Sequence, residues 1–241
     1  MQVEQLHPPG PPIEVDALLA GLRPRERAPA DRPLVMVNMV ATVDRLITVG
    51  GKSGPIGGEG DHAMFHGLRT VVDAILVGTG TLRAERYGRM VRRPERRALR
   101  ASLGLQEDPL AILITKSGDL PWDAPLFGEP MQRVVIAGPC APPPVAAQVT
   151  VIDPAAPAEA LRAVRSGFGV RSVLCEGGPT LNRALLGDGV LDELFLTVAP
   201  KLAGEDEALR ILSGEPLEAP AEMELLSVCR HDGELYLRYA L

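Results

Sequence analysis

Short, continuous runs of apolar and β-branched residues recur along the chain from Leu34 onward, and this rhythm constrains the fold more than any other feature. The run Ala111-Ile-Leu-Ile114 contains no polar residue, so both faces of the strand would be apolar, which is typical of a strand covered on both faces. Glycine or polar turn residues follow most of the runs. The predicted strands are Leu34–Val40, Ala74–Val77, Leu110–Ile114, Arg133–Ala137, Val149–Ile152, Ser172–Cys175, Glu193–Val198, Met223–Val228 and Leu235–Ala240.

Residues with helical spacing fill several of the intervals between these runs. They are Glu59–Val71, Ala158–Ser166 and Thr180–Leu186, and a proline stands at the expected first turn of the second and third. The last two apolar runs are joined without a helix by a segment that ends in Asp232-Gly233, a dipeptide typical of antiparallel hairpins. The sequence therefore predicts an α/β sandwich on a mainly parallel sheet with an antiparallel C-terminal hairpin.

The first 33 residues differ from the rest of the chain in composition. Seven of them are proline, and one short helical pattern, Val15 to Leu22, lies between the prolines. We expect a proline-rich N-terminal arm over residues 1–33, which is either an ordered strap over the domain or a dimer, or a loose tail. No linker or internal repeat follows, so residues 34–241 are expected to form one domain.

Charge is unevenly distributed along the chain. The net charge is −6, yet the segment from Arg83 to Arg100 holds eight arginines against two glutamates, a local charge of +6 that leaves −12 for the rest. This segment is either a solvated face or a field that attracts a small polyanion, and we favour the second interpretation for its leading residues. The acidic average, with only 3% aromatic residues, argues against nucleic acid as a partner.

Cysteine and histidine usage gives no sign of a disulfide framework or a metal centre. The three cysteines are far apart and form no C-x-x-C motif. His62 and His66 have the i, i+4 spacing of a zinc helix, but the segment lacks the glutamate of a zinc protease, so we expect no metal. Because neither a signal peptide nor an apolar membrane span is visible, we expect a cytoplasmic protein with no membrane partner.

Two glycine turns each follow a predicted buried strand. One is Gly78-Thr-Gly-Thr81 and the other is Glu176-Gly-Gly-Pro-Thr180. Glycine lets the backbone approach a phosphate closely, and the start of a helix offers unpaired N–H groups to an anion. Each segment alone could be a tight strand-to-helix turn, but two such turns in one sheet favour a phosphate-bearing ligand.

Motifs of other enzyme classes are missing from the sequence. It contains no G-x-S-x-G nucleophile elbow, no P-loop and no zinc deaminase signature, so a phosphate-bearing cofactor is favoured over covalent catalysis.

Six ordered motifs resemble the reductase half of the riboflavin-biosynthesis deaminase/reductase. They are Asn38–Asp44, Lys52–Gly57, Asp73–Gly88, Thr115–Gly118, Glu176–Leu181, and Leu191–Leu194 with Ala199–Lys201.

This resemblance implies a dihydrofolate-reductase-like fold and a function. The family is similar in fold to dihydrofolate reductase, and the resemblance implies an NADPH-dependent enzyme that reduces 5-amino-6-(5-phosphoribosylamino)uracil to its ribitylamino product. The reaction would be hydride transfer to C1′ of the ring-opened ribosyl imine. A homodimer is also expected from the family, and the exposed edge of the C-terminal hairpin is a candidate contact.

The resemblance also assigns residues by position. NADPH would be held by Ala41, Thr42, Gly78, Thr81, Thr115, Lys116, Ser117, Gly177, Gly178, Pro179, Thr180 and Leu181, with Thr115 to Ser117 on its 2′-phosphate. The phosphorylated pyrimidine would be bound by Ser53, Arg69, Arg89 and Glu176. The catalytic residues implied are Glu85, Asn38 and Asp44, with Glu85 assisting ring opening.

Two positions depart from the family pattern. Arg45 replaces a glycine that many members carry after the aspartate, and Asn38 stands where some members carry a lysine. Asparagine can hydrogen-bond a hydroxyl group but brings no charge. Two alternatives therefore stay open: a dihydrofolate-reductase-like enzyme acting on another pterin or pyrimidine, and a catalytically silent NADP-binding protein.

Overall fold

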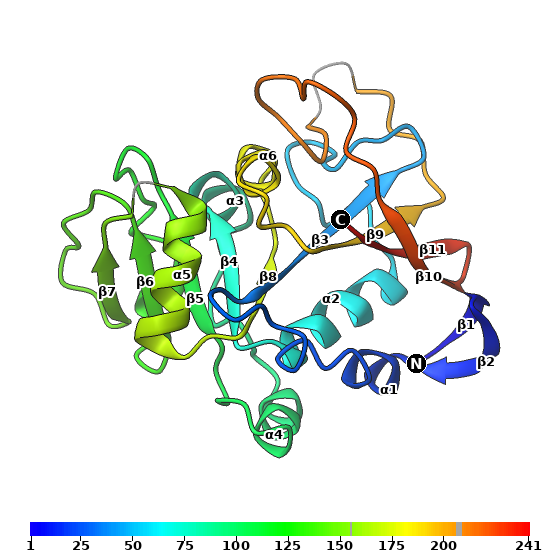
Figure 1. The fold of residues 1–241 in the computed structure, drawn as a ribbon, viewed down its shortest axis with the longest axis horizontal. Helices are drawn as coiled ribbons and strands as arrows, with labels where there is room; N and C mark the ends of the chain where they lie inside the picture. The colour runs from blue at the N-terminus through cyan, green and yellow to red at the C-terminus, as the bar shows by residue number, and fades with distance from the viewer. Residues whose placement is uncertain (155, 206–208) are drawn as a thin grey trace.

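One sheet of 11 strands runs through the described part of the chain, which comprises residues 1–154, 156–205 and 209–241 of a computed structural model (Figure 1). Its spatial order is β2-β1-β10-β11-β9-β3-β8-β4-β5-β6-β7. The strands are β1 (Gln2–His7), β2 (Pro9–Glu14), β3 (Leu34–Thr42), β4 (Ala74–Gly78), β5 (Leu110–Ile114), β6 (Arg133–Ala137), β7 (Gln148–Ile152), β8 (Ser172–Cys175), β9 (Glu193–Ala199), β10 (Glu224–His231) and β11 (Glu234–Ala240).

The strands from β9 to β7 in this order all pair in parallel. Their central members are covered on both faces, and Ala74, Ile75, Leu76 and Val77 of β4 are each 0% exposed. Such strands need apolar residues at every position, which is why they appear in the sequence as continuous runs. Each strand predicted from an apolar run is present, with ends that differ by at most three residues.

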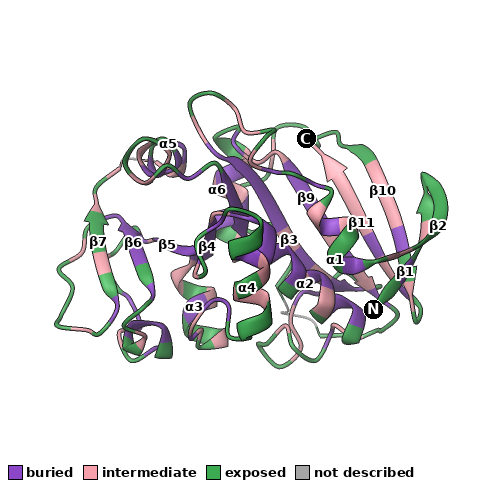
Figure 2. Cartoon of the chain, turned by 90° about the horizontal axis from the view of Figure 1, so that it is seen from below, coloured by how far each residue is buried: buried purple, intermediate pink, exposed green. Residues whose placement is uncertain are grey.

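Helices cover both faces of this sheet, which makes a three-layer arrangement (Figure 2). On one face, α1 (Val15–Ala20), α2 (Glu59–Val71) and α3 (Thr79–Glu85) pack their apolar side chains against the strands. On the other face lie α5 (Pro157–Phe168) and α6 (Pro179–Gly187). The chain also forms α4 (Pro94–Ser102) and a 3₁₀ turn at Pro125–Gly128. The predicted α/β sandwich is confirmed, and none of the helices in the described ranges has the length and apolarity to span a membrane.

The C-terminal hairpin is antiparallel as predicted, but its outer edge is not exposed. Asp232 and Gly233 have φ values of 45° and 83°, the left-handed pair that a two-residue hairpin turn requires. The outer strand β10 pairs with β1 of the same chain, so the edge strand on this side is β2. Prolines in β2 lack the N–H that would pair with another strand. The predicted homodimer therefore has no open edge on β10 to use.

The N-terminal segment is an ordered part of the sheet and core. Val3 and Leu19 are each 1% exposed, and they pack in the same apolar cluster as α2. Arg32 donates to both oxygens of Asp192 at 2.7 and 2.8 Å and so fastens the end of the segment to the start of β9. Of the two forms considered for residues 1–33, the structure has the ordered one. The domain boundary after residue 33 stays a prediction.

Two glycines in helices give a matched test of this packing. A Cβ at Gly60 in α2 would overlap the Tyr236 hydroxyl, whereas one at Gly167 in α5 would have no atom within 4 Å. We expect Gly167→Ala to raise the free energy of unfolding by about 0.5–1 kcal/mol, because alanine is the better helix former. Gly60→Ala should lower it by about 1–3 kcal/mol. Equal shifts of the urea midpoint would contradict the contact between α2 and β11.

Candidate functional site

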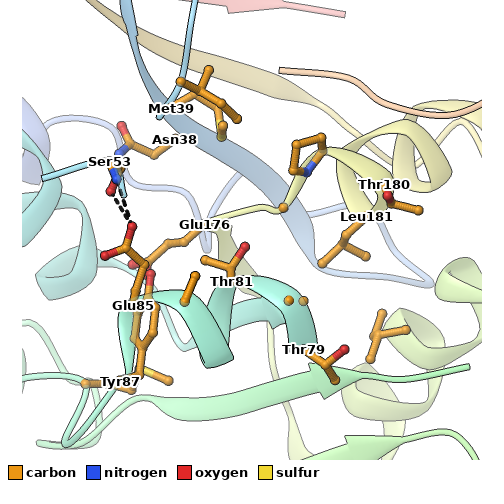
Figure 3. Close-up of a pocket in the computed structure, with 18 of the residues that line it drawn as sticks. Asn38, Met39, Ser53, Thr79, Thr81, Glu85, Tyr87, Glu176, Thr180 and Leu181 are labelled. Atoms are coloured by element: carbon orange, nitrogen blue, oxygen red, sulfur yellow. Dashed lines mark hydrogen bonds between the residues drawn. The ribbon is translucent and has the colours of Figure 1, made fainter. Parts of the chain in front are cut away.

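A cavity of about 1160 Å³ opens at the carboxyl ends of the parallel strands β3, β4, β5, β6 and β8. This is where ligands bind in open α/β sheets, because the loops that leave the strands diverge there. Side chains from β3 and α2, both glycine turns, and the segments after β5 and β6 line the cavity. Figure 3 shows Asn38, Ser53 and Glu85 toward one side of the pocket and Thr180 and Leu181 toward the other.

The two glycine turns that the sequence singles out meet at one wall of this cavity. The Gly78 N–H donates to the Gly177 carbonyl oxygen at 2.7 Å. They meet because β4 and β8 are neighbouring parallel strands with Leu76 opposite Cys175, so Gly78 reaches the level of the turn that follows β8. A Cβ at Gly78 would lie 3.2 Å from the Gly178 nitrogen, so only glycine fits here without a shift of the backbone. Gly177 has a φ of 83°, a second reason for glycine at this turn.

Helix α6 starts at this wall with its first turn uncapped. Gly178 is the N-cap residue and offers no side chain to the free N–H groups, and Pro179 takes the first helical position. Pro179, Thr180 and Leu181 all line the cavity. The backbone donors of this turn and the helix dipole therefore favour an anionic group in the adjacent space.

The segment after β5 brings a cation and two hydroxyl groups to the cavity. Thr115, Lys116 and Ser117 line it, with Lys116 and Ser117 exposed. The Thr115 hydroxyl oxygen accepts from Gly118 N–H at 3.0 Å, which fixes the turn. Within the described ranges Lys116 forms no ion pair, so its charge is available to a ligand.

Ser53 and Glu85 connect a loop to the end of α3. The Ser53 N–H and hydroxyl both donate to Glu85 Oε1 at 2.9 Å, as the dashed lines in Figure 3 show. Both residues line the cavity, as does Asn38 of β3. A carboxylate that accepts two hydrogen bonds on one oxygen still has the second oxygen, Oε2, for a hydroxyl group of a ligand.

Arg69 and Glu176 form a buried ion pair in the cavity wall. Arg69 Nε and Nη2 donate to the two Glu176 oxygens at 2.6 and 2.7 Å, and Nη1 donates to the Met90 carbonyl at 2.7 Å. The guanidinium carbon lies 4.2 Å from the centre of the Phe65 ring and 5.2 Å from that of Tyr87. Burial opposes the charge on Arg69, but the attraction and hydrogen bonds of Glu176 outweigh it and raise its pKa. The pair is neutral overall.

Burial also affects the aromatic neighbour of this pair. Tyr87 lines the cavity beside Arg69, and its pKa is raised well above the usual value, mainly by burial and then by the charge of Glu176. The phenol therefore keeps its proton at neutral pH and can act as a hydrogen-bond donor.

The arginine-rich segment divides into paired and unpaired side chains. Its leading arginines are paired with carboxylates: Arg83 with Asp119, Arg86 with Asp123, and Arg89 with both oxygens of Asp108. Arg96 pairs with Asp16, while Arg97 and the buried Arg100 donate to backbone carbonyls. In the described part of the chain this leaves Arg92 and Arg93 with neither a carboxylate nor a carbonyl partner, and both line the cavity. The free positive charge thus lies on these two residues instead of the leading ones.

Four of the residues predicted from the resemblance do not line the cavity: Ala41, Thr42, Asp44 and Gly177. Asp44 accepts N–H groups of Ala203 and Gly204, the latter at 2.8 Å. The Thr42 hydroxyl accepts Leu46 N–H at 3.0 Å. A hydrogen bond from the Thr42 side chain, together with the backbone donors, lowers the pKa of Asp44. These side chains shape the loop after β3; the other predicted site residues line the cavity itself.

Sequence reasoning missed a group of cavity residues on α2. Asp61, His62, Phe65 and His66 line the cavity from the first two turns of the helix. The i, i+4 histidine spacing was the signal available, since it places both imidazoles on one helix face. In the described ranges no group of three or more His, Cys, Asp or Glu side chains is arranged to hold a metal ion.

Comparison with known proteins gives consistent matches. The family model of the RibD C-terminal domain matches residues 33–237. A 2,5-diamino-6-ribosylamino-4(3H)-pyrimidinone 5′-phosphate reductase of Methanothermobacter thermautotrophicus is 26% identical over 83% of this chain and 92% of its own length. The riboflavin biosynthesis protein RibD of Mycobacterium tuberculosis is 31% identical over 71% of this chain, which spans 43% of that protein.

The fold has a close structural match. The crystal structure of a pyrimidine reductase-like protein from Corynebacterium diphtheriae superposes with a TM-score of 0.78, at 23% identity, and the match covers 95% of this chain and 99% of that one. At this identity the likeness concerns the fold.

The Arg69–Glu176 pair gives a stability prediction. Arg69→Ala leaves Glu176 buried without its cation, and we expect the free energy of unfolding to fall by about 3–5 kcal/mol. The control Arg83→Ala breaks an ion pair whose side chains are 50% and 76% exposed. Because solvent screens such a pair, its urea midpoint should stay close to that of the wild type. Similar losses in both variants would contradict the importance of the buried pair.

Proposed function

We infer that the chain is a reductase of riboflavin biosynthesis, because it belongs to the family of the RibD C-terminal domain. Its substrate in this proposal is 5-amino-6-(5-phosphoribosylamino)uracil, its cofactor is NADPH, and the ribosyl group is reduced to ribityl. The observation that carries the proposal is the meeting of two glycine turns at the wall of a cavity of about 1160 Å³. A pocket for one ligand has roughly 300–1000 Å³, so there is room for cofactor and substrate together.

The wall formed by the two glycine turns suits a dinucleotide. Side chains would crowd this wall: a Cβ at Gly78 would lie 3.2 Å from the Gly178 nitrogen, and a Cβ at Gly178 would lie 3.0 Å from Thr81 Oγ1. The uncapped first turn of α6 supplies N–H donors for a phosphate. In this proposal the cofactor is held by Gly78, Thr81 and residues 178–181, and Gly177 shapes the turn. Ala41 and Thr42 have only an indirect role, as residues of β3 that do not line the cavity.

NADPH is the finer part of the cofactor proposal. It differs from NADH by a phosphate on the adenosine ribose, which calls for a cation and hydroxyl donors. Lys116 and Ser117 are exposed at the cavity, beside Thr115, in a combination that suits this group. The names of the relatives support a nicotinamide-dependent reductase more generally.

The substrate side has the groups that the reaction needs. When bound, the reduced nicotinamide supplies a hydride for C1′ of the ribosyl group, and the protein orients the substrate and excludes water. Glu85, already held by Ser53, accepts a hydrogen bond from a ribosyl hydroxyl and so favours the open-chain sugar. Asn38 hydrogen-bonds a neighbouring hydroxyl or the imine nitrogen. Asp44 takes part only by shaping the loop after β3.

The 5′-phosphate of the substrate is assigned to Arg92 and Arg93. Arg69 and Arg89, the two arginines expected on sequence grounds, are each neutralised by both oxygens of a carboxylate. They position Glu176 and the wall of the cavity. Arg92 and Arg93 line the same cavity with their charges free in the described structure, and an arginine without a carboxylate can bind phosphate at no cost of breaking a pair.

The relatives leave the pyrimidine itself open between two compounds. The archaeal relatives are named for a 2,5-diamino-pyrimidinone, whereas the proposed substrate carries an oxygen at C2. Both share the phosphoribosylamino group at which the reduction takes place. Competition between the two compounds at equal concentration measures the preference of this protein.

The cofactor proposal predicts unequal stabilisation by the two nicotinamides. At equal concentration NADPH should raise the melting temperature more than NADH, because the 2′-phosphate adds charge-assisted hydrogen bonds. Lys116→Ala should weaken NADPH binding by about tenfold or more and leave NADH binding unchanged. Equal shifts of the wild-type protein by both nicotinamides would contradict the assignment of Thr115 to Ser117.

The proposed substrate predicts which compound the protein reduces. The wild-type protein should oxidise NADPH with the phosphoribosylaminouracil and not with dihydrofolate, which separates the proposal from a dihydrofolate-reductase-like activity.

The assignment of the 5′-phosphate predicts a change in KM. Replacing Arg92 and Arg93 together by alanine should raise the KM for the phosphoribosylaminouracil by about 10- to 100-fold. Arg83→Ala is the control, because Arg83 lies outside the cavity lining. Hydride transfer to none of the pyrimidines or pterins would support a silent NADP-binding protein instead.

A further inference from the structure

Asp61 is a buried carboxyl group in the cavity for which the proposed reaction has no role so far. It is the third residue of α2, it is 7% exposed, and it lines the cavity. A Cβ at Gly57 would overlap its carboxyl group, so the loop before α2 passes closely over Asp61. Asp61 is thus held in a narrow space with one side open to the site.

Among the described residues, Asp61 lacks the cation that two of the other buried carboxyl groups have. Glu176 is paired with Arg69, and Glu193 with Arg27 and Arg238. Asp61 has no ion pair within the described ranges. A buried carboxylate without a cation is costly, and such a group keeps its proton instead.

A second carboxyl group, Glu234, lies beside it and accepts hydrogen bonds on both of its oxygens. Glu234 Oε1 accepts Gly58 N–H at 2.6 Å, and Oε2 accepts Asp61 N–H at 3.1 Å and the Tyr236 hydroxyl at 2.7 Å. Glu234 thus accepts three donors on its two oxygens. The hydrogen bond that acts on the Asp61 side chain comes from Thr197.

The groups that face Asp61 act in both directions on its pKa. Burial raises the pKa most, and the negative charge of Glu234 on β11 raises it further. A hydrogen bond from Thr197 of β9 and the charges of His62 on α2 and Lys201 after β9 lower it, but by less. The net result is a pKa above that of an ordinary aspartic acid.

The sheet register places Asp61 close to the residues assigned to the substrate. Asn38 and Val40 are two residues apart on one face of β3, and both line the cavity. Val40 pairs with Thr197 of β9, the residue that faces Asp61. Residues two apart along a strand are separated by roughly 7 Å. Because Asp61 faces Thr197 at the level of Val40, it is displaced from Asn38 along the strand direction by about this distance. A ribosylaminopyrimidine can span this distance.

We propose that Asp61 is the proton donor that opens the ribosyl ring, a role that rests on the proposed reductase function. Its carboxyl proton moves to the ring oxygen O4′ as the C1′–O4′ bond breaks, and the bonding pair stays on the oxygen as a hydroxyl group. The lone pair of the exocyclic nitrogen forms the C1′=N bond, and Asp61 is left as the carboxylate. A hydride from the reduced nicotinamide then completes the reduction at C1′, and solvent returns the proton to Asp61.

Glu85 is less suited to this step. Its Oε1 accepts two hydrogen bonds from Ser53, which fix the carboxyl group and leave Oε2 to accept a hydrogen bond from a sugar hydroxyl. The two acidic residues therefore divide the work: Glu85 orients a hydroxyl group of the sugar, and Asp61 donates the proton. Separate environments for two carboxyl groups are the usual way in which one site holds an acid and an anion together.

The test compares Asp61→Asn with the wild-type protein. Asparagine keeps the shape of the side chain but cannot release a proton to O4′, so kcat should fall by about 10²- to 10⁴-fold. The shift in melting temperature caused by NADPH should be unchanged. Asp119→Asn, which removes a carboxyl group outside the cavity lining, is the matched control and should retain the wild-type kcat.

The pH dependence gives a readout that a structural role would not produce. Only protonated Asp61 donates, so wild-type kcat/KM should fall as pH rises through its pKa. The titration of Asp61, followed by NMR of protein with ¹³C-labelled aspartate, should have the same midpoint. The matching resonance should be absent from Asp61→Asn. This comparison stands even if Asp61→Asn does not fold, because both measurements can be made on the wild type.

Each outcome bears on the proposal. A kcat of Asp61→Asn within threefold of the wild type would overturn the role of Asp61 and leave the reductase function in place. So would an NMR midpoint that differs from the kinetic one. If the wild-type protein reduces neither pyrimidine, the reductase function itself is overturned, and with it the role of Asp61.

Discussion

The buried ion pair between Arg69 and Glu176 is the interaction on which the site depends. It joins the end of α2 to the residue that follows β8, and through Arg69 Nη1 it also holds the Met90 carbonyl. Arg100 donates in turn to the carbonyl of Arg69. One guanidinium group thus connects the helical layer, the sheet and the arginine-rich segment. Because Glu176 directly precedes the Gly177–Gly178 turn, the same pair helps to fix the turn that Gly78 contacts.

Much of the fold is predictable because it follows from short-range patterns. The bounds of α2, β5, β6 and β8 are those that the periodicity predicts, and the Asp232–Gly233 turn has the expected conformation. The N-terminal segment is not predictable in this way. Its strand β1 pairs with β10, more than 200 residues away. From the sequence alone its prolines are typical of a loose arm, because the sheet edge with which the segment pairs is formed by the other end of the chain. Partners so distant in sequence leave no local signal.

The ion pairs of the site are likewise not predictable from local sequence. Sequence comparison brings Arg69, Arg89 and Glu176 into the site, but it does not reveal that the arginines are neutralised there. A local excess of arginine shows that positive charge is concentrated in one segment. Which side chains are free depends on carboxylates such as Asp108 and Asp119 that follow later in the chain and reach the segment only in the fold. Asp61 is missed for a related reason, since its burial next to Glu234 joins residues 173 positions apart.

The distribution of charge in the cavity bears directly on the ligands it can take. Lys116 on the segment after β5 and Arg92 and Arg93 between α3 and α4 are cations without ion pairs in the described structure, and they come from separate elements. The Arg69–Glu176 pair makes its part of the cavity wall neutral, because the two charges cancel. A site of this kind favours phosphate groups at separate places and uncharged rings at the neutral wall.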